Sequence, residues 1–255
     1  MNVNKIYNEN CLNTMSRMKD SFIDLTVTSP PYDNLRSYNG YSFEFESIAK
    51  ELFRVTKEGG VVVWNVSDAT VKGSETGTSF RQALFFIECG FRLHDTMIYE
   101  KFGRIPTQDR YYNVFEYMFV FSKGKPKCMN FIKDHKNKTK GAIKKADTCI
   151  NKGNNIKSGK IIKTGEFSRR SNIWKYATGG NDKTGHPAVM PQKMAGDHIV
   201  SWSNEGDLIY DPFTGSGTTP KMSVLNNRNY IGSEISADYC EIARQRINQV
   251  QLKLF

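Results

Sequence analysis

The sequence predicts an α/β fold with a doubly wound, mostly parallel sheet and an inserted basic region. Three observations predict it. Strand and helix patterns alternate over residues 1–122, they alternate again from about residue 184, and the stretch between them lacks periodicity. A chain of 255 residues is long enough for one such domain with an insertion. We therefore expect residues 1–122 and 184–255 to form the two halves of one domain, with residues 123–183 inserted between them.

The expected elements follow from the spacing of apolar residues. In the first half, the pattern predicts strands over 22–27, 61–64, 91–99 and 115–121 and helices over 44–56 and 78–89, with Gly59-Gly60 ending the first helix. In the second half, it predicts helices over 194–203, 217–226 and 237–251 and strands over 208–210 and 230–233. Strands that alternate with helices indicate a parallel sheet.

The charge of the chain is concentrated in the expected insertion. The net charge is +10, but residues 123–175 hold 16 Lys or Arg against three acids, so the rest of the chain is slightly acidic. A basic segment on a neutral-to-acidic body is expected where that segment lies along a polyanion. The alternative is a disordered, solvated lysine-rich segment. Its internal position, between two well-patterned halves, favours a recognition element.

Several classes of protein are disfavoured by the composition. No apolar stretch approaches the roughly 18 residues of a membrane span, and the polar start, residues 2–13, does not resemble a secretory signal. The five cysteines are scattered, and the four histidines have no ligand spacing among themselves or with the cysteines. We expect a cytoplasmic protein with reduced, mostly structural cysteines, no metal site and no membrane partner.

Two motifs follow short apolar runs. Thr28-Ser29-Pro30-Pro31-Tyr32 comes after residues 23–27, and the stretch from Asp211 to Thr219 comes after residues 208–210. Each motif should therefore stand at the carboxyl end of a buried parallel strand, where open α/β sheets bind their ligands. Together the two motifs suggest a group-transfer site.

The second motif contains a glycine turn. Gly215, Ser216 and Gly217 would let backbone N–H groups approach a ligand closely, and Glu234 stands 19 residues after Gly215, a spacing suited to a ribose-binding acid. A phosphate-binding loop would need a lysine after the last glycine, and a nucleophile elbow would need glycines two residues on either side of its serine; both are missing. A tight turn without a ligand remains the alternative.

The first motif offers hydrogen-bond acceptors and an aromatic ring. Pro30 and Pro31 have fixed φ angles and no N–H group, so the carbonyls around them are available to a substrate. With the Ser29 hydroxyl they could accept both hydrogens of an exocyclic amino group, while Tyr32 provides a surface on which a base can stack. An ordinary Pro-Pro loop with a packed tyrosine is the alternative.

These motifs resemble those of the amino-group DNA methyltransferases of bacteria and phage. Residues 28–32 look like the catalytic motif of that family, Asp211 to Thr219 looks like its cofactor loop, and Glu234 matches its ribose-binding acid. His186 and Pro187 are similar to the element that lines the methionine side of the cofactor. The resemblance covers residues 5–122 and 184–252, and its motif order is that of the permuted β class.

The resemblance implies a Rossmann-like methyltransferase fold that binds S-adenosyl-L-methionine and methylates double-stranded DNA. Residues 1–122 would then be the catalytic half, residues 184–255 the cofactor-binding half, and residues 123–183 the target-recognition insertion. The implied cofactor-binding residues are Asn10, Thr28, His186, Pro187, Asp211, Phe213, Gly215, Ser216, Gly217, Thr218 and Glu234. Asn10 stands where the family commonly has an acid. A homodimer and a companion restriction endonuclease are further partners that the resemblance allows.

The expected reaction transfers a methyl group to the amino nitrogen of a flipped base, with Ser29, Pro30, Pro31 and Tyr32 as the catalytic residues. Serine before Pro-Pro-Tyr favours cytosine N4 in this family, with adenine N6 as the rival. Candidate DNA-binding residues are Arg36, Tyr38 and Tyr41 in the loop after the motif and Arg169 and Arg170 in the insertion. The alternatives are a methyltransferase for RNA or protein and a non-catalytic DNA-binding regulator.

Overall fold

The computed structural model describes residues 1–31, 43–103, 109–146, 149–151, 154–156, 160–177 and 189–251. The chain divides into two compact units. Unit 1 comprises residues 1–130 together with 172–255, and unit 2 comprises residues 131–171. Unit 2 thus lies within the stretch that lacks periodicity in the sequence.

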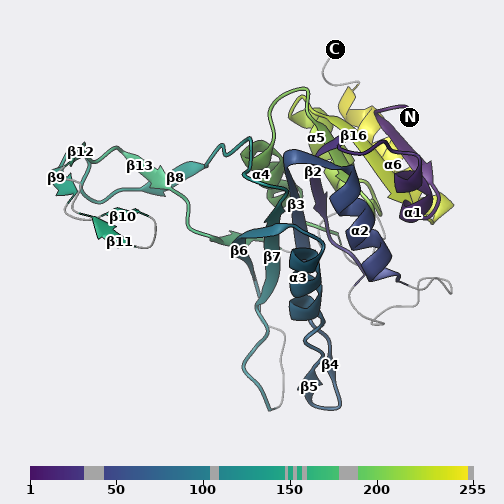
Figure 1. The fold of residues 1–255 in the computed structure, drawn as a ribbon, viewed down its shortest axis with the longest axis horizontal. Helices are drawn as coiled ribbons and strands as arrows, with labels where there is room; N and C mark the ends of the chain where they lie inside the picture. The colour runs from purple at the N-terminus through teal and green to yellow at the C-terminus, as the bar shows by residue number, and fades with distance from the viewer. Residues whose placement is uncertain are drawn as a thin grey trace. The chain divides into compact units, whose positions relative to one another are not determined.

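Unit 1 is built on an eight-stranded sheet (Figure 1). Its strands, in spatial order, are β1 (Lys5–Asn8), β16 (Asn229–Glu234), β15 (Leu208–Asp211), β2 (Ile23–Thr28), β3 (Thr56–Val66), β7 (Phe115–Ser122), β6 (Arg92–Lys101) and β14 (Ile173–Tyr176). Neighbours from β1 to β3 pair in parallel, β7 is antiparallel to both of its neighbours, and β14 is parallel to β6. The predicted mostly parallel sheet is confirmed.

Helices cover the sheet and bury its apolar residues. They are α1 (Cys11–Ser16), α2 (Phe45–Val55), α3 (Thr78–Glu88), α4 (Gln192–Trp202), α5 (Thr218–Leu225) and α6 (Ala237–Gln251). Residues of α1, α2 and α3 share one core cluster with β2 and β3, and residues of α6 form a second with β1 and β16. Residues 61–66 of β3 are all buried, so both faces of the sheet centre are covered.

Most predicted elements exist within a few residues of their expected bounds, but one boundary was wrong. Gly59 and Gly60 do not lie between a helix and a strand, because β3 begins directly after α2, at Thr56, and contains both glycines. Gly59 has φ +75°, and a Cβ on Gly60 would lie 3.0 Å from the Asp24 carbonyl oxygen. The two glycines therefore allow an irregular start of β3 against β2, where the register shifts.

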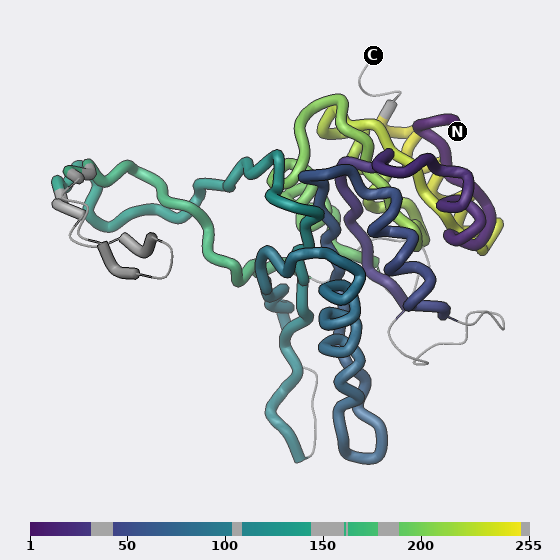
Figure 2. The backbone as a smooth tube through the Cα atoms, in the orientation of Figure 1, coloured from purple at the N-terminus to yellow at the C-terminus, as the bar shows by residue number. Residues whose placement is uncertain are grey.

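Short elements were not predicted. Unit 1 also contains β1, α1, β14 and the hairpin β4 (Thr70–Val71) and β5 (Ser74–Glu75), which are too short or too polar to show a period. Figure 2 traces the whole backbone, with the described part of α6 near its yellow end.

Unit 2 consists of antiparallel pairs. β8 (Lys133–Lys136) pairs with β13 (Phe167–Arg169), β9 (Ile143–Ala146) with β12 (Lys160–Lys163), and β10 (Cys149–Asn151) with β11 (Asn154–Ile156). Strands β8 and β13 run beside each other in Figure 2. Unit 2 has regular strands although its sequence lacks an apolar period, because pairing between these strands supplies the backbone hydrogen bonds.

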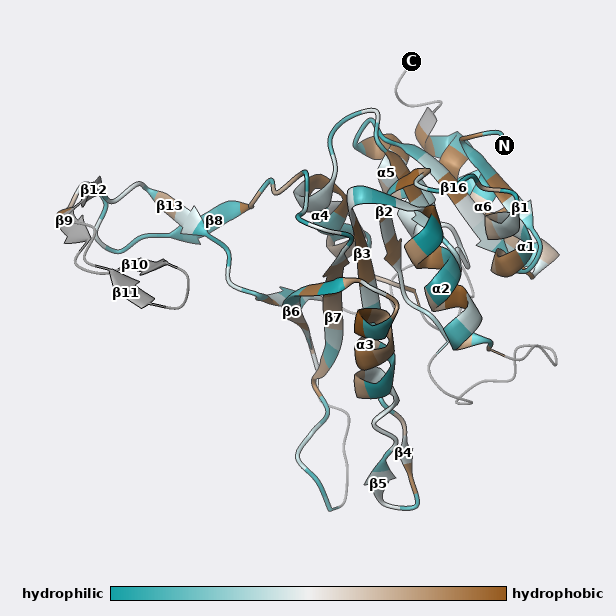
Figure 3. Ribbon diagram, viewed as in Figure 1, coloured by the Kyte–Doolittle hydropathy of each residue, from teal (hydrophilic) through white to brown (hydrophobic). Residues whose placement is uncertain are grey.

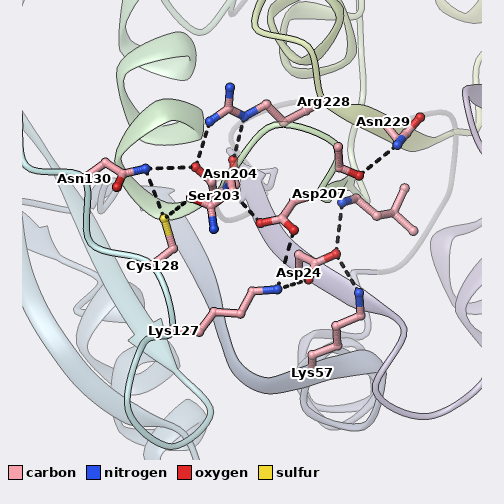
Figure 4. Close-up of polar contacts among 12 residues, drawn as sticks. Asp24, Lys57, Lys127, Cys128, Asn130, Ser203, Asn204, Asp207, Arg228 and Asn229 are labelled. Atoms are coloured by element: carbon pink, nitrogen blue, oxygen red, sulfur yellow. Dashed lines mark hydrogen bonds and ion pairs between the residues drawn. The ribbon is translucent and has the colours of Figure 1, made fainter.

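A polar network ties the first residues after β7 to the amino edge of the sheet (Figure 4). The buried Asp24 side chain accepts hydrogen bonds from Lys57 Nζ at 2.7 Å, from Lys127 Nζ and from the Leu208 N–H at 3.0 Å. Lys123 Nζ donates to two backbone carbonyls, at 2.8 and 3.0 Å. Lys123 and Lys127, both in the basic stretch, therefore have partners within unit 1.

Candidate active site at the carboxyl edge of the sheet

The two sequence motifs meet because β2 and β15 are adjacent parallel strands. Thr28 ends β2 and Asp211 ends β15, and the Thr28 hydroxyl donates a hydrogen bond of 2.7 Å to Asp211 Oδ1. The two side chains are buried and 183 residues apart in the sequence. The bond fixes the start of the Ser29-Pro30-Pro31 segment against the start of the glycine turn.

Backbone N–H groups of the turn after Asp211 donate hydrogen bonds that stabilise it. Phe213 N–H donates to Asp211 Oδ1 at 3.1 Å, and Thr214 N–H donates to the Ser233 carbonyl at 2.9 Å. The two glycines of the turn have positive φ angles, +51° at Gly215 and +84° at Gly217. A Cβ on Gly217 would lie 2.6 Å from the Cβ of Ala243 in α6, so only glycine lets α6 pack this closely.

Glu234 stands beside this turn, at the end of β16. Its Oε2 accepts the Gly215 N–H at 2.8 Å and its Oε1 accepts the Ser236 N–H at 2.8 Å. Burial raises the pKa of Glu234, while the bonds from the two backbone N–H groups oppose that rise. Each carboxylate oxygen keeps a second lone pair, so Glu234 can still accept hydroxyl groups of a ligand.

Ser29 and the glycine turn line one cavity. Besides Ser29, its lining comes from the second half of the chain: Val189, Met190, Asp211, Phe213, Thr214, Gly215, Ser216, Thr218 and Thr219. The expected meeting of the two motifs in one crevice therefore occurs. Burial raises the pKa of Asp211 to about 6, although hydrogen bonds from Thr28 and Phe213 favour the charged form.

Some predicted residues occupy other positions or are not described. Asn10 follows β1 and caps α1, where its Oδ1 accepts the Leu12 N–H at 2.8 Å; β1 pairs with β16 so that Asn8 lies opposite Glu234. Asn10 thus lies near the carboxyl edge with one side-chain lone pair already used. The following predicted residues lie outside the described residues: Tyr32, Arg36, Tyr38, Tyr41, His186 and Pro187.

The structure adds residues that the sequence did not single out. Val189 and Met190 line the cavity, and they come shortly after the predicted His186-Pro187 element in the sequence. Arg246 of α6 is only 9% exposed, and its guanidinium donates to the Ser216 carbonyl and, at 2.8 Å, to the Ser216 hydroxyl. An arginine on the apolar face of the closing helix, between Ala243 and Ile247, was the signal that could have found it.

The two candidate arginines of unit 2 differ in their surroundings. The guanidinium of Arg170 pairs with the Asp134 carboxylate, with Nε 3.0 Å from Oδ2, and its side chain is 16% exposed. Arg169 is exposed, and its guanidinium lies 4.2 Å from the ring centroid of Phe131. Arg170 therefore has a structural partner within the unit, whereas Arg169 presents a stacked cation at the surface.

Two absences hold for the part of the chain that the structure describes. No helix there is both long and apolar enough to cross a membrane. No group of three or more His, Cys, Asp or Glu side chains there could hold a metal ion. Three of the cysteines, Cys11, Cys128 and Cys240, are buried free thiols, and Cys89 is half-buried.

Residues 23–245 match the family model of the N6/N4 methyltransferases, described as DNA methylase. The chain belongs to this family. It is 58% identical over 242 residues to the orphan methyltransferase M.BamHII of Bacillus amyloliquefaciens, with 89% of each chain covered. The predicted membership in the amino-group DNA methyltransferase family is confirmed, whereas the assignment to the permuted β class stays a prediction.

Solved structures of the family have the same fold. The PvuII DNA methyltransferase, which is cytosine-N4-specific, aligns with a TM-score of 0.71 at 20% identity, over 98% of this chain and 92% of that one. A putative DNA modification methylase of Thermus thermophilus, solved in complex with S-adenosyl-L-methionine, aligns with a TM-score of 0.67 at 19% identity, over 96% and 93% of the two chains. The predicted Rossmann-like methyltransferase fold is thus confirmed.

Proposed function

We propose that this DNA methylase transfers the methyl group of S-adenosyl-L-methionine to N4 of a cytosine in double-stranded DNA. The observation that carries the proposal is the cavity lined both by Ser29 and by the glycine turn, because methyl transfer needs the target amino group and the donor at one place. The Thr28–Asp211 bond makes this arrangement part of the sheet itself.

The residues of the turn fit the cofactor. When bound, S-adenosyl-L-methionine supplies an electrophilic methyl group on a positively charged sulfur. Gly215 leaves the backbone of the cavity wall uncovered by a side chain, Glu234 has lone pairs for ribose hydroxyls, and Asp211 is one of the residues that line the cavity. A cavity lined by the acidic residue Asp211 suits a cationic ligand.

Ser29 and Pro30 would prepare the target nitrogen. An exocyclic amino nitrogen is a weak nucleophile, because its lone pair is delocalised into the base. If the Ser29 hydroxyl and the Pro30 carbonyl accept its two hydrogens, the nitrogen becomes pyramidal and its lone pair is directed at the methyl group. Ser29 is half-buried at the end of β2, so the duplex must release the base before it can enter.

The target base is the finer part of the proposal. Serine at position 29 supports cytosine N4, because the family associates serine before Pro-Pro-Tyr with that base; adenine N6 is the rival. The 58% identical relative is named an orphan methyltransferase, and a homodimer and a companion restriction endonuclease stay predictions for this chain. Cytoplasmic localisation likewise stays a prediction.

The deciding experiment incubates the purified chain with labelled S-adenosyl-L-methionine and mixed-sequence duplex DNA, followed by mass spectrometry of the digested nucleosides. We expect N4-methylcytosine. Labelled N6-methyladenine would establish the rival, and DNA binding without label transfer would establish the regulatory alternative. RNA and protein added in place of DNA test the remaining alternatives.

Two variants test the roles proposed for Ser29 and Tyr32. Ser29→Ala should lower the transfer rate about 10²–10³-fold, as the loss of one stabilising hydrogen-bonding group in an active site commonly does. Ser16→Ala, at an exposed position of α1, is the matched control.

Tyr32→Ala should weaken capture of the target base far more than cofactor binding, because only the base uses the face of the ring. Equal losses of both affinities would contradict the role of Tyr32.

A further inference from the structure

Helix α6 carries a buried arginine within its apolar stripe. Figure 3 shows both hydrophobic and hydrophilic colouring along this helix. Arg246 is only 9% exposed, and it lies among buried positions that recur every three or four residues, which are Cys240, Ala243, Ile247 and Val250. A guanidinium group stays charged in a protein, so burying it costs free energy unless hydrogen bonds replace its contacts with water. The partners of Arg246 therefore indicate its role.

These partners include two oxygen atoms of one residue in the glycine turn. Arg246 Nη1 donates to the Ser216 carbonyl oxygen and, at 2.8 Å, to the Ser216 hydroxyl oxygen. Ser216 is 3% exposed and lines the same cavity as Ser29, whereas Arg246 is not among the described residues that line it. Arg246 thus holds a residue of the cavity wall without being part of that wall.

The same side of α6 also contacts the residue after Ser216. Ala243 precedes Arg246 by three positions, so the two lie on one side of the helix. A Cβ on Gly217 would lie 2.6 Å from the Cβ of Ala243. Two successive residues of the turn, Ser216 and Gly217, therefore pack against α6.

The chemistry of the two side chains fixes the direction of their hydrogen bond. A guanidinium group has N–H donors and no acceptor, so the Ser216 hydroxyl oxygen accepts in its contact with Arg246. The hydroxyl keeps its own hydrogen, which is then directed away from Arg246 and is available to a ligand in the cavity. Without the guanidinium, the hydroxyl would be free to rotate towards a backbone carbonyl of its own segment instead.

We propose that Arg246 is a positioning residue for the cofactor, and that it holds Ser216 so that the Ser216 hydroxyl donates to an acceptor oxygen of S-adenosyl-L-methionine. The carboxylate and the ribose hydroxyls of the cofactor both offer such oxygens. The inference rests on the proposed cofactor cavity and is independent of the target base. It requires that Arg246 acts on cofactor affinity through Ser216.

A double-mutant cycle tests this dependence. Isothermal titration calorimetry of the full chain with S-adenosyl-L-methionine, without DNA, gives the dissociation constants. We expect Ser216→Ala and Arg246→Met each to raise the dissociation constant about fivefold to tenfold, the effect of one lost hydrogen bond, and the double variant to raise it no further. If Arg246 only stabilised the fold, the two effects would be independent, and the double variant would bind about 25–100-fold more weakly than the wild type.

Kinetics provide a second measurement. In the methyl-transfer assay, KM for the cofactor should rise by a similar factor in both single variants, whereas kcat at saturating cofactor should stay within about twofold of the wild-type value, because the lost interaction contributes to binding alone. Arg246→Lys should recover part of the affinity, since its ammonium group can donate to one of the two Ser216 oxygens.

Arg244→Met is the matched control. Arg244 lies on the same helix, its side chain is 45% exposed, and its guanidinium donates to the Ile6 carbonyl at 3.2 Å. The substitution removes the same charge from α6 without touching Ser216. The dissociation constant for S-adenosyl-L-methionine should therefore equal that of the wild type.

A truncated ligand distinguishes the two acceptor oxygens. The compound 5′-deoxy-5′-methylthioadenosine keeps the ribose of the cofactor and lacks its carboxylate. If Ser216→Ala weakens binding of both ligands, the hydroxyl donates to the ribose; if it weakens only the binding of S-adenosyl-L-methionine, the hydroxyl donates to the carboxylate. A Ser216→Ala variant that binds both ligands as tightly as the wild type would overturn the inference.

The remaining outcomes separate the inference from the proposed function. Independent effects in the double-mutant cycle, beside a wild type that binds the cofactor and transfers methyl groups, would overturn the inference alone. A wild type that does not bind S-adenosyl-L-methionine would overturn both. If circular dichroism shows that Arg246→Met does not fold, Arg246→Lys replaces it in the cycle, and Ser216→Ala should then cost less affinity in the lysine variant than in the wild type.

Discussion

The close approach of α6 to the glycine turn gives a prediction whose size can be worked from the structure. In Gly217→Ala, the added Cβ would lie 2.6 Å from Ala243 Cβ and 2.9 Å from Ala243 Cα, and the residue would keep φ +84°. The left-handed backbone costs a non-glycine residue about 1–2 kcal/mol, and overpacking costs about 1–3 kcal/mol more because backbone must move. We expect a loss of about 2–5 kcal/mol in the free energy of unfolding.

Gly206→Ala separates the two contributions. Gly206 has φ +82°, almost the same as Gly217, but a Cβ there has no atom within 4 Å. It should therefore lose only the backbone contribution, about 1–2 kcal/mol. Effects on the unfolded chain are the same for both substitutions and cancel in the comparison.

The measurement is urea-induced unfolding of the two variants and the wild type, followed by circular dichroism. Gly217→Ala should be less stable than Gly206→Ala by about 1–3 kcal/mol. It should also bind S-adenosyl-L-methionine more weakly, because residue 217 adjoins the cavity, whereas Gly206→Ala should bind it normally. Equal losses of stability would refute the close packing of α6 on the turn.

Three further predictions concern charged groups. Burial raises the pKa of Asp211 to about 6, so the contribution of Asp211 to stability is greatest below the ordinary pKa of an aspartate. That contribution falls by up to about 3 kcal/mol as the pH rises through 6. Asp211→Asn should abolish this fall in a series of urea-unfolding measurements at different pH values. Burial also raises the pKa of Asp24, but hydrogen bonds from Lys127 and Lys57 lower it overall, so its contribution is present at neutral pH and lost in acid below its ordinary value. Lys127→Met should therefore destabilise unit 1 at pH 7 and leave DNA affinity unchanged; weakened DNA binding with normal stability would contradict this role. Arg169→Ala should weaken DNA binding by about 1–3 kcal/mol in a titration, and Arg170→Ala should weaken it less because Arg170 already pairs with Asp134.

Local pattern was sufficient for most elements of unit 1. The alternation of apolar runs predicted most helices and strands of unit 1, since burial on a sheet or helix imposes a period that the sequence shows directly. The same signal was weak for β1, α1 and β14, which are short and partly polar. It also failed at Gly59-Gly60, where backbone hydrogen bonds with Lys123 and Lys127 outweighed the tendency of glycine to break a strand.

By itself, the sequence determined that Ser29 and Gly215 each follow a buried strand, because those residues stand next to apolar runs that must be covered. Only the tertiary structure decided that β15 lies beside β2, which brings Thr28 and Asp211 within 2.7 Å of each other. It also decided that Lys127 donates a hydrogen bond to the buried Asp24 and that Arg246 donates one to Ser216. Such contacts join residues far apart in the chain, and strand order and helix packing, rather than any local period, select them.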